Sequence, residues 1–387
     1  MDRTMHTTLS SWRYTLERIA IWRNARTLAS GLYPTRADAR QALRGLKDVT
    51  LENHRIRYFT RSVRVGERNY QLLTYPGRPS RAWDLFITNE LHRVHPIPGH
   101  AEGLMVLLMA MTRKCPLSCA HCFEGDVLNK KDEIDAEDVI AMIRKFQERG
   151  VAQVELAGGE PMNRFEDLIH ILRSSDHCAS DFWVLTSGWN LTPERTRRMK
   201  EAGLTGVGVS VDHWNEAAHD RFRGRNGSFA HAEKAVRSAR EAGLVVALSL
   251  VPLRDFCNMK DLLQYADLAA NWRAHFIRIV EPRAVGNFAG KDVELGPNEH
   301  AVLDDFVRVL HTEKRYRHYP IVDHYGSYQR AVGCSGAGKR FLYVDTVGDV
   351  HVCPFCRKSC GSALRDSMDE LHKTMMVTGG CAVHATV

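Results

Sequence analysis

The sequence predicts an α/β fold: a partial (β/α)6 TIM barrel with an N-terminal α+β appendage and a small, cysteine-rich C-terminal domain. Between residues 104 and 280, six short apolar segments alternate with helical segments, and such alternation specifies a parallel sheet. Before residue 100 the periodicity differs, and seven of the ten cysteines fall in two groups, 115–122 and 334–360. We therefore expect an appendage at 1–100, a barrel at 101–290 and a cysteine-rich domain at 291–387.

The composition is that of an ordinary globular protein, with 44% hydrophobic and 26% charged residues. The longest apolar run, 103–111, is far shorter than the roughly 20 residues that a membrane span needs. The first residues do not lead into the apolar core of a signal peptide. We expect a cytoplasmic protein that does not enter a membrane.

Positive charge is concentrated at the N-terminal end. Residues 1–80 carry 15 Lys and Arg against 6 Asp and Glu, whereas the whole chain has a net charge of +7. A basic segment could face an acidic peptide, a phosphorylated substrate or nucleic acid. The arginines do not form one dense run, so we expect a solvated basic face and no nucleic-acid partner.

The appendage is predicted as two helices and a hairpin. The first helix spans 10–30, and Thr35 begins a second helix that runs to Leu46. Alternation at 55–59 and 62–73, with a turn at Gly66, predicts the hairpin, and prolines mark its exit. One apolar face of the first helix holds Trp12, Leu16, Ile19, Trp22 and Leu28. The appendage is either a substrate-recognition module or a structural cap on one end of the barrel.

The barrel is predicted from strands that alternate with helices. The candidate strands are 104–111, 153–157, 182–186, 206–211, 245–251 and 276–280. The candidate helices are 135–147, 165–172, 193–202, 229–242 and 260–269. Chemistry in such barrels sits at the carboxyl ends of the strands, so the residues that follow each strand are the candidate site.

Three cysteines follow the first strand in the pattern Cys115-x3-Cys119-x2-Cys122. Three thiolates can hold a cubane [4Fe-4S] cluster but leave its fourth iron open, where a small chelating molecule can bind. The alternative is a zinc knuckle that uses a fourth ligand such as His121. After the second strand, Gly158-Gly159-Glu160-Pro161 offers a close backbone approach and a carboxylate that can accept from an ammonium group.

These motifs, in this order and spacing, resemble the radical S-adenosylmethionine (SAM) superfamily. The resemblance implies that the open iron chelates SAM, and that one-electron reduction splits it into methionine and a 5'-deoxyadenosyl radical. The implied SAM contacts are Gly158, Gly159, Glu160 and Pro161 at the amino group, Ser210 at the ribose, Arg221 at the carboxylate, and His121 with the strand ending at Val251 at the adenine. A surface ion pair with Asp220 or Glu216 is the alternative for Arg221.

The second cysteine group reads Cys334-x13-Gly348-x4-Cys353-x2-Cys356-x3-Cys360, with Cys381 near the end, and a hairpin at 341–352 delivers it. It resembles the auxiliary-cluster domain called SPASM or, when truncated, twitch. The resemblance implies one auxiliary [4Fe-4S] cluster on Cys334, Cys353, Cys356 and Cys381, with Cys360 spare. A zinc ribbon and a dithiol redox pair are the alternatives. Outside the two groups, Cys178 and Cys257 are expected to be buried as small hydrophobes.

Together these features predict an iron-sulfur oxidoreductase with two [4Fe-4S] clusters and SAM, supplied with electrons by a flavodoxin or ferredoxin. The substrate is expected to be a ribosomally made peptide, and the alternatives are a small metabolite or a non-catalytic zinc-binding protein. Sulfatase-maturing relatives carry Asp where this chain has Pro354, which argues against that activity.

Overall fold

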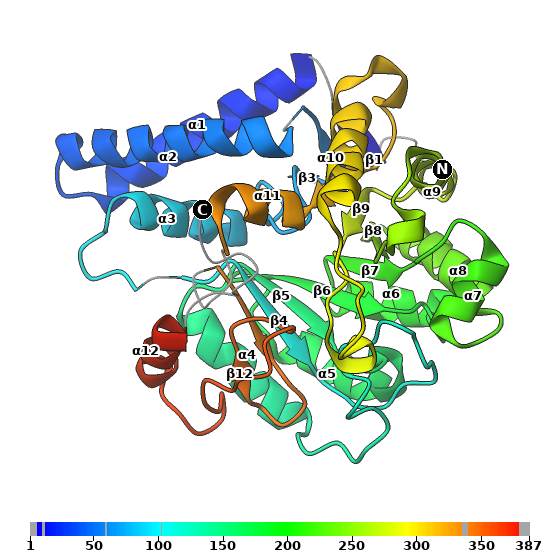
Figure 1. Cartoon of the computed structure of the whole chain (residues 1–387). Helices are drawn as coiled ribbons and strands as arrows, with labels where there is room; N and C mark the ends of the chain where they lie inside the picture. Colours follow the sequence, from blue (N-terminus) through cyan, green and yellow to red (C-terminus); the bar gives the residue numbers. More distant parts are fainter. Residues whose placement is uncertain (1–5, 10–11, 59, 102, 335–339, 379–387) are drawn as a thin grey trace.

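The computed structural model describes residues 6–9, 12–58, 60–101, 103–334 and 340–378. One sheet of nine strands dominates, in the order β10-β9-β8-β7-β6-β5-β4-β11-β12 (Figure 1). Its strands are β4 (Val106–Ala110), β5 (Gln153–Ala157), β6 (Asp181–Thr186), β7 (Gly206–Ser210), β8 (Val245–Leu250), β9 (Phe276–Ile279), β10 (Ile321–His324), β11 (Phe341–Val344) and β12 (Val350–His351).

All neighbouring strands pair in parallel except β11 and β12, which form an antiparallel hairpin. The six strands β4 to β9 confirm the predicted partial barrel, each within two residues of its expected bounds. Strand β10, which extends the sheet beyond β9, was not predicted. Strand β11 was predicted as one arm of a hairpin, but its parallel pairing with β4 was not. In the described part of the chain β10 and β11 do not pair, so the barrel is open between them. The expected boundary at residue 290 stays a prediction.

Helices cover the outer face of the sheet, and their apolar sides form the main core with its outward-facing strand residues (Figure 1). They are α4 (Ala136–Glu148), α5 (Phe165–Ser174), α6 (Pro193–Glu201), α8 (Ser228–Glu241), α9 (Met259–Asn271), α10 (Pro297–Thr312) and α12 (Met368–Thr378). Helix α7 (Glu216–Arg223) packs against α8, and α11 (Tyr325–Val332) packs against α2 (Arg36–Arg57). None of the described helices is long and apolar enough to cross a membrane.

The appendage contains β1 (His6–Leu9), α1 (Trp12–Leu32), α2 (Arg36–Arg57), β2 (Ser62–Val65), β3 (Arg68–Tyr70) and α3 (Arg81–Val94). Thr35 caps α2 as predicted, accepting from the backbone N–H of Asp38. The predicted end of this helix at Leu46 is wrong, because the helix continues to Arg57 and replaces the start of the expected strand at 55–59. Helix α3, capped by Ser80, was not predicted at all.

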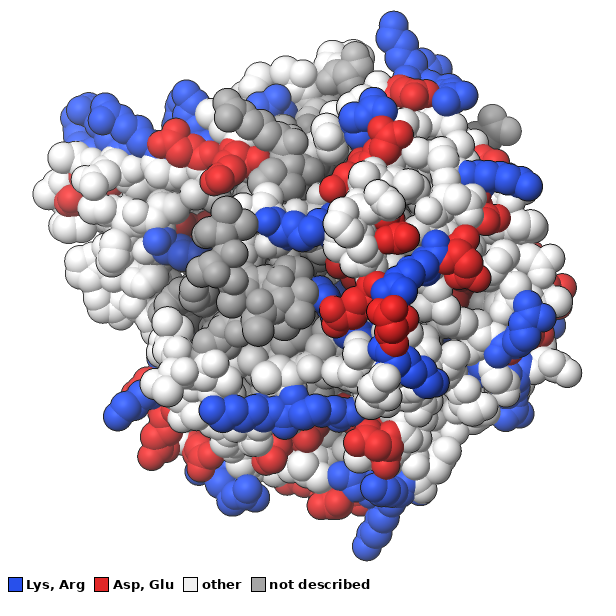
Figure 2. All heavy atoms as spheres, viewed as in Figure 1, with Lys and Arg blue, Asp and Glu red and all other residues white. Residues whose placement is uncertain are grey.

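The apolar residues predicted on one face of α1 differ in burial: Trp22 and Leu28 pack against the appendage core, whereas the other three are exposed. Trp12, Leu16 and Ile19 are 64%, 54% and 51% exposed. The buried side instead carries the small residues Ala25 and Ala29, which allow the helices to approach closely. Figure 2 shows basic side chains over the α1–α2 end of the appendage, with both signs interspersed over the rest of this face.

The β2–β3 hairpin closes the amino-terminal end of the barrel. Val63, Val65 and Tyr70 pack against inward-facing residues near the starts of the strands, among them Trp183 and Phe276. At the same end Arg68 forms an ion pair of 2.9 Å with the buried Asp181. The structure thus supports the interpretation of the appendage as a cap, on the end opposite to the candidate site.

Candidate active site

The loop after β4 carries Cys115, Cys119 and Cys122 at the carboxyl end of the sheet. The Cys119 side chain is buried, and the other two are half-buried. Burial raises the pKa of Cys115 to about 12 and that of Cys122 to about 11. Both thiols therefore hold their protons at neutral pH until a metal displaces them.

Backbone hydrogen bonds join the Gly158-Gly159 turn to the segment between β4 and Cys115. Gly159 N–H donates to the Thr112 carbonyl at 2.6 Å, and Glu160 N–H donates to the Lys114 carbonyl at 2.8 Å. Gly158 has a φ of +133°, and a Cβ there would stand 2.5 Å from the Thr112 carbonyl oxygen. The absence of side chains at both glycines permits this close approach of the two backbone segments. It would equally permit a ligand to approach the backbone.

Two further segments clamp the cysteine loop. At the end of α7, the carbonyl of Phe222 accepts from the backbone N–H of Ala120 at 2.9 Å. After β9, Asn287 donates its backbone N–H to the Cys122 carbonyl and its side-chain amide to the Cys119 carbonyl, both at 2.9 Å. A Cβ on the neighbouring Gly286 would stand 2.2 Å from the Cys122 carbonyl oxygen. The loop is thus fixed by backbone contacts from three separate elements.

A buried ion pair lies against the loop. The Arg223 guanidinium contacts the Cys119 sulfur at 3.6 Å and the Asp212 carboxylate at 2.6 Å. Burial alone would raise the pKa of Asp212, but the charges of Arg223 and of nearby histidines outweigh it and lower that pKa. Asp212 also accepts from the backbone N–H of Val251 at 3.1 Å. The pair places a fixed positive charge beside the sulfur that would ligate iron.

His121 stacks on Phe222, with ring centroids 4.9 Å apart. Its Nδ1 is buried without a hydrogen-bond partner, and burial lowers its pKa to about 4, so the ring is neutral. Arg223 Nε is likewise buried without a partner. Buried polar atoms without a hydrogen-bond partner are uncommon in folded proteins. Their presence beside the cysteine loop is expected where a further group binds, because that group would supply the missing contacts.

The Glu160 carboxylate is fully engaged within the protein. It accepts from Thr186 Oγ1 at 2.7 Å, Ser187 N–H at 2.8 Å, Ser187 Oγ at 2.5 Å and Met162 N–H at 3.2 Å. Burial raises its pKa, and these donors oppose that shift. A ligand ammonium group must therefore share or replace one of these donors, most simply the Ser187 hydroxyl.

The remaining predicted SAM contacts lie at separate places. Pro161 follows Glu160 at the start of a short 3-10 helix, Ser210 ends β7, and Val251 directly follows β8, all at the carboxyl ends of strands. Arg221 is exposed on α7 and makes no ion pair with any described residue, so the alternative, a surface pair with Asp220 or Glu216, is not seen. Arg221 stays a prediction for the SAM carboxylate.

Sequence reasoning missed Arg223, which lies closer to the cysteines than Arg221. Helical periodicity could have found it: Arg223 is four residues after His219, and both are buried on the same side of α7. Arg221, two residues after His219, points elsewhere. The Gly286–Asn287 clamp was missed because no local pattern links it to a loop more than 160 residues earlier.

Among the described residues, no three His, Cys, Asp or Glu side chains converge closely enough to bind a single metal ion. A zinc knuckle requires four ligand atoms within about 2.0 to 2.3 Å of one ion, so the structure gives that alternative no support. Thiolates on a cubane bind different irons and stand farther apart. The choice of a cluster therefore rests on the spacing of the three cysteines.

The β11–β12 hairpin delivers the second cysteine group as predicted, with Tyr343 opposite His351 and Gly348 at the turn. Cys353 and Cys356 lie in one tight turn, whereas Cys360 is 4% exposed in the core. Cys334 precedes β11, and Cys381 lies outside the described residues. Of the isolated cysteines, Cys257 is buried as expected. Cys178 is exposed, against expectation, because it lies in a surface turn held by Asp176.

The two cysteine groups meet through the residues that follow them. Phe123, directly after Cys122, makes edge contacts with Phe355 and Tyr343, at centroid distances of 6.1 and 5.8 Å. Glu124 accepts from the Tyr343 hydroxyl at 2.9 Å and faces Arg357 at 3.6 Å. The turn that carries Cys353 and Cys356 is thereby packed against the first cysteine loop.

The inner face of the barrel is lined by small residues near its carboxyl end. Ala110, Ala157, Gly208, Ser210 and Ser249 stand where closed barrels carry bulky branched side chains. Below them, Arg278 forms two contacts of 3.0 and 3.1 Å with the buried Glu155 and is 22% exposed.

The family description "Radical SAM superfamily" matches residues 109–269. Mycofactocin maturase MftC of Mycolicibacterium smegmatis is 30% identical over 279 residues, 68% of this chain and 69% of that protein. PqqA peptide cyclase of Rhizobium meliloti is 26% identical, over 64% of this chain and 67% of that protein. AdoMet-dependent heme synthase of Nitratidesulfovibrio vulgaris is 23% identical, over 67% of this chain and 76% of that protein.

Among solved structures, Streptococcus suis SuiB bound to the precursor peptide SuiA has a TM-score of 0.57 at 13% identity. The match covers 69% of this chain and 64% of SuiB. At this identity the likeness concerns the fold, and it agrees with the partial barrel described above.

Proposed function

Since this chain belongs to the radical SAM superfamily and is therefore an enzyme that uses a [4Fe-4S] cluster and SAM, we propose that Cys115, Cys119 and Cys122 hold that cluster. The observation that carries the proposal is the three-sided clamp on this loop, with Arg223 against Cys119. When bound, the cluster supplies the electron that cleaves SAM into methionine and a 5'-deoxyadenosyl radical.

The chain's own residues would position SAM and keep water from it. The small residues at the carboxyl end of the barrel leave room for it, and the Gly158-Gly159 backbone lies beside the cysteine loop. We keep Glu160 for the amino group, Ser210 for the ribose, and His121 with Val251 for the adenine. For the carboxylate we keep Arg221, and the alternative is Arg223, which lies against Cys119 but is paired with Asp212.

For the second site we propose one auxiliary [4Fe-4S] cluster on Cys334, Cys353, Cys356 and Cys381. Cys360, the fifth cysteine of this group, is left outside the shell. A shell of four thiolates leaves no iron open, so its role would be electron transfer or support of the substrate pocket. The contact of Phe123 with Phe355 supports close placement of the two sites.

We propose that the substrate is a ribosomally made peptide, from which the radical abstracts hydrogen in the cytoplasm, with a flavodoxin or ferredoxin as electron donor. The similarity to a peptide cyclase and to a maturase supports this choice. Similarity to a heme synthase favours a second candidate, a small metabolite. Because each relative extends beyond the match, neither substrate follows from similarity alone.

The test is hydrogen transfer. Short peptides encoded near the gene are prepared with deuterated side chains and incubated anaerobically with the reconstituted enzyme, SAM and dithionite. We expect deuterium in 5'-deoxyadenosine and a peptide of altered mass. Cleavage of SAM with no label from any such peptide, but with label from a deuterated porphyrin, would favour the small-metabolite candidate.

A further inference from the structure

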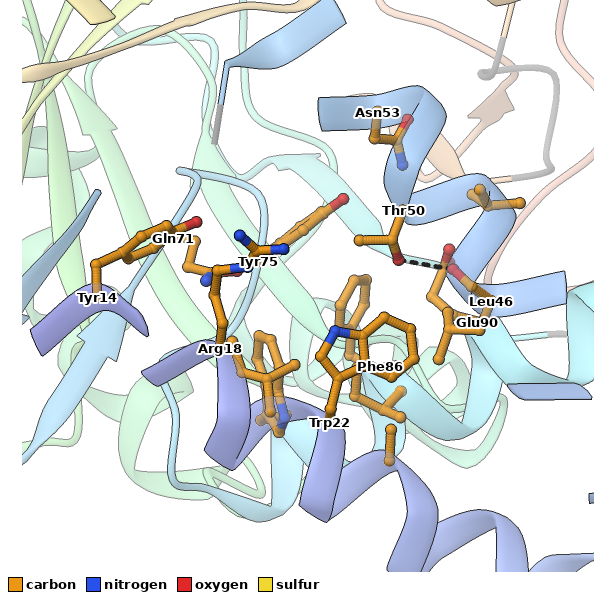
Figure 3. Close-up of a pocket in the computed structure, with 15 residues that line it drawn as sticks. Tyr14, Arg18, Trp22, Leu46, Thr50, Asn53, Gln71, Tyr75, Phe86 and Glu90 are labelled. Carbon is orange, nitrogen blue, oxygen red and sulfur yellow. Dashed lines mark hydrogen bonds between the residues drawn. The ribbon is translucent and has the colours of Figure 1, made fainter. Parts of the chain in front are cut away.

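A cavity of about 80 Å³ lies between α1, α2 and α3, in the appendage (Figure 3). Aromatic rings form much of its wall, including Trp22 on α1 and Phe86 on α3, whose ring is 4.6 Å from that of Tyr75. These helices pack beside Met105, just before β4, whereas the cysteine loop follows the other end of that strand. The cavity is therefore separate from the candidate active site.

Three polar side chains line this cavity with no hydrogen bond or ion pair to any residue that the structure describes: Arg18, Asn53 and Gln71. Asn53 is only 7% exposed, Gln71 is half-buried and Arg18 is exposed. In Figure 3 the Arg18 side chain extends from α1 toward Tyr75 and Gln71, and Asn53 lies on the facing helix α2. Together they offer donors that a bound group could satisfy.

The charge of the cavity favours an anion. Its one carboxylate, Glu90, is already paired with Arg93 and, at 2.8 Å, with Arg340. Arg18 is therefore the cation left without a partner among the described residues that line the cavity. A guanidinium fork with amide groups matches the oxygens of a carboxylate, and aromatic walls suit an apolar stem. Pockets for drug-sized ligands measure about 300 to 1,000 Å³, so this one takes a group the size of a single side chain.

We propose that this cavity binds a carboxylate on a short apolar stem, held by Arg18 with Asn53 and Gln71. A glutamate side chain of a peptide and a small free carboxylic acid share this chemistry. Beside Arg18, the exposed Ile19, Arg23 and Arg26 continue the site along the surface of α1. The proposal does not depend on radical chemistry, because it concerns the opposite end of the barrel.

The test uses the full chain without clusters or SAM and follows tryptophan fluorescence, because two of the seven tryptophans, Trp22 and Trp83, line the cavity. Butyrate and the capped peptide Leu-Glu-Leu-Glu-Leu are titrated, each against its neutral amide counterpart, butyramide or the Gln peptide. We expect saturable binding of at least one acid and none of either amide. Arg18→Met should weaken binding at least tenfold, since it removes a charge-assisted contact. The control Arg40→Gln, on an exposed part of α2, should leave it unchanged.

The outcomes separate the sources. Binding of butyrate alone assigns a free acid, and binding of the peptide alone assigns a peptide side chain. The comparison of acids with amides on the unaltered protein needs no variant, so a folding defect cannot obscure it. The proposal is overturned if neither acid binds, if the amides bind equally well, or if Arg18→Met binds like the unaltered protein.

Discussion

Removing Arg223 is the most informative single change, because it leaves the Asp212 carboxylate buried without its counter-ion. Both side chains are less than 10% exposed, and their charged groups are 2.6 Å apart. Breaking a buried pair by deleting one partner costs about 3 to 5 kcal/mol. With a urea m-value of about 3 kcal/mol per molar, Arg223→Met should lower the unfolding midpoint of the cluster-free protein by about 1 to 1.7 M at pH 7.

The effect should depend on pH with a definite sign. In the unaltered protein the pKa of Asp212 is lowered, so its contribution to stability is present above the unfolded pKa of about 3.9 and is lost as the pH falls below it. Without Arg223, burial raises that pKa, and protonation relieves the penalty as the pH falls from 7 toward 4. The difference between the two proteins should therefore shrink in acid.

The assay is urea unfolding at pH 7, 5 and 4, followed by far-ultraviolet circular dichroism. Arg223→Met combined with Asp212→Leu should recover much of the lost stability, because no charge is then left unpaired. The control Arg237→Met removes an exposed pair with Glu233 and should cost less than about 1 kcal/mol. A loss below 1 kcal/mol for Arg223→Met at pH 7, or a double variant no more stable than the single one, would refute this reasoning.

Two further predictions concern other charged and steric contacts. Burial raises the pKa of Glu281, but a hydrogen bond from His324 and nearby positive charges bring it down to about 2. Glu281→Gln should therefore cost about 3 kcal/mol at pH 7, a loss that fades between about pH 5 and pH 2, and an equal loss at pH 7 and pH 3 would contradict this. Gly286→Ala should roughly halve the iron bound after reconstitution, because its Cβ meets the Cys122 carbonyl, while Gly290→Ala, with equally positive φ and open space, should retain it. Equal iron in both variants would show that the clamp is not needed.

Much of the barrel could be predicted from the sequence because its strands are short apolar runs separated by amphipathic helices. Strand β5 has the predicted bounds, and the helix predicted from Pro193 begins there. The appendage was less predictable. Periodicity showed that α1 has an apolar face but not which face packs inward, and the buried Glu17 is held by Arg78 and Asn69, which lie far along the chain.

The candidate site also has residues that could be predicted from the sequence and contacts that could not. The cysteines and the Gly-Gly-Glu-Pro turn are local patterns with local chemistry, so they could be found in the sequence. The ion pair of Arg223 with Asp212 depends on how α7 is rotated against the loop, and the Asn287 clamp depends on the end of β9. Spacing within α7 groups Arg223 with His219, but it does not identify the partners of Arg223, which are brought to it by packing.

Formation of 5'-deoxyadenosine tests the central claim most directly. The anaerobically reconstituted protein is mixed with SAM and dithionite, and the product is measured for the unaltered protein, for the variant with Cys115, Cys119 and Cys122 all changed to Ala, and for Cys353→Ala. The account predicts product from the unaltered protein and from Cys353→Ala, and none from the triple variant. Product from the triple variant, or its loss in Cys353→Ala while the first cluster is retained, would contradict the assignment of SAM cleavage to the first cysteine loop.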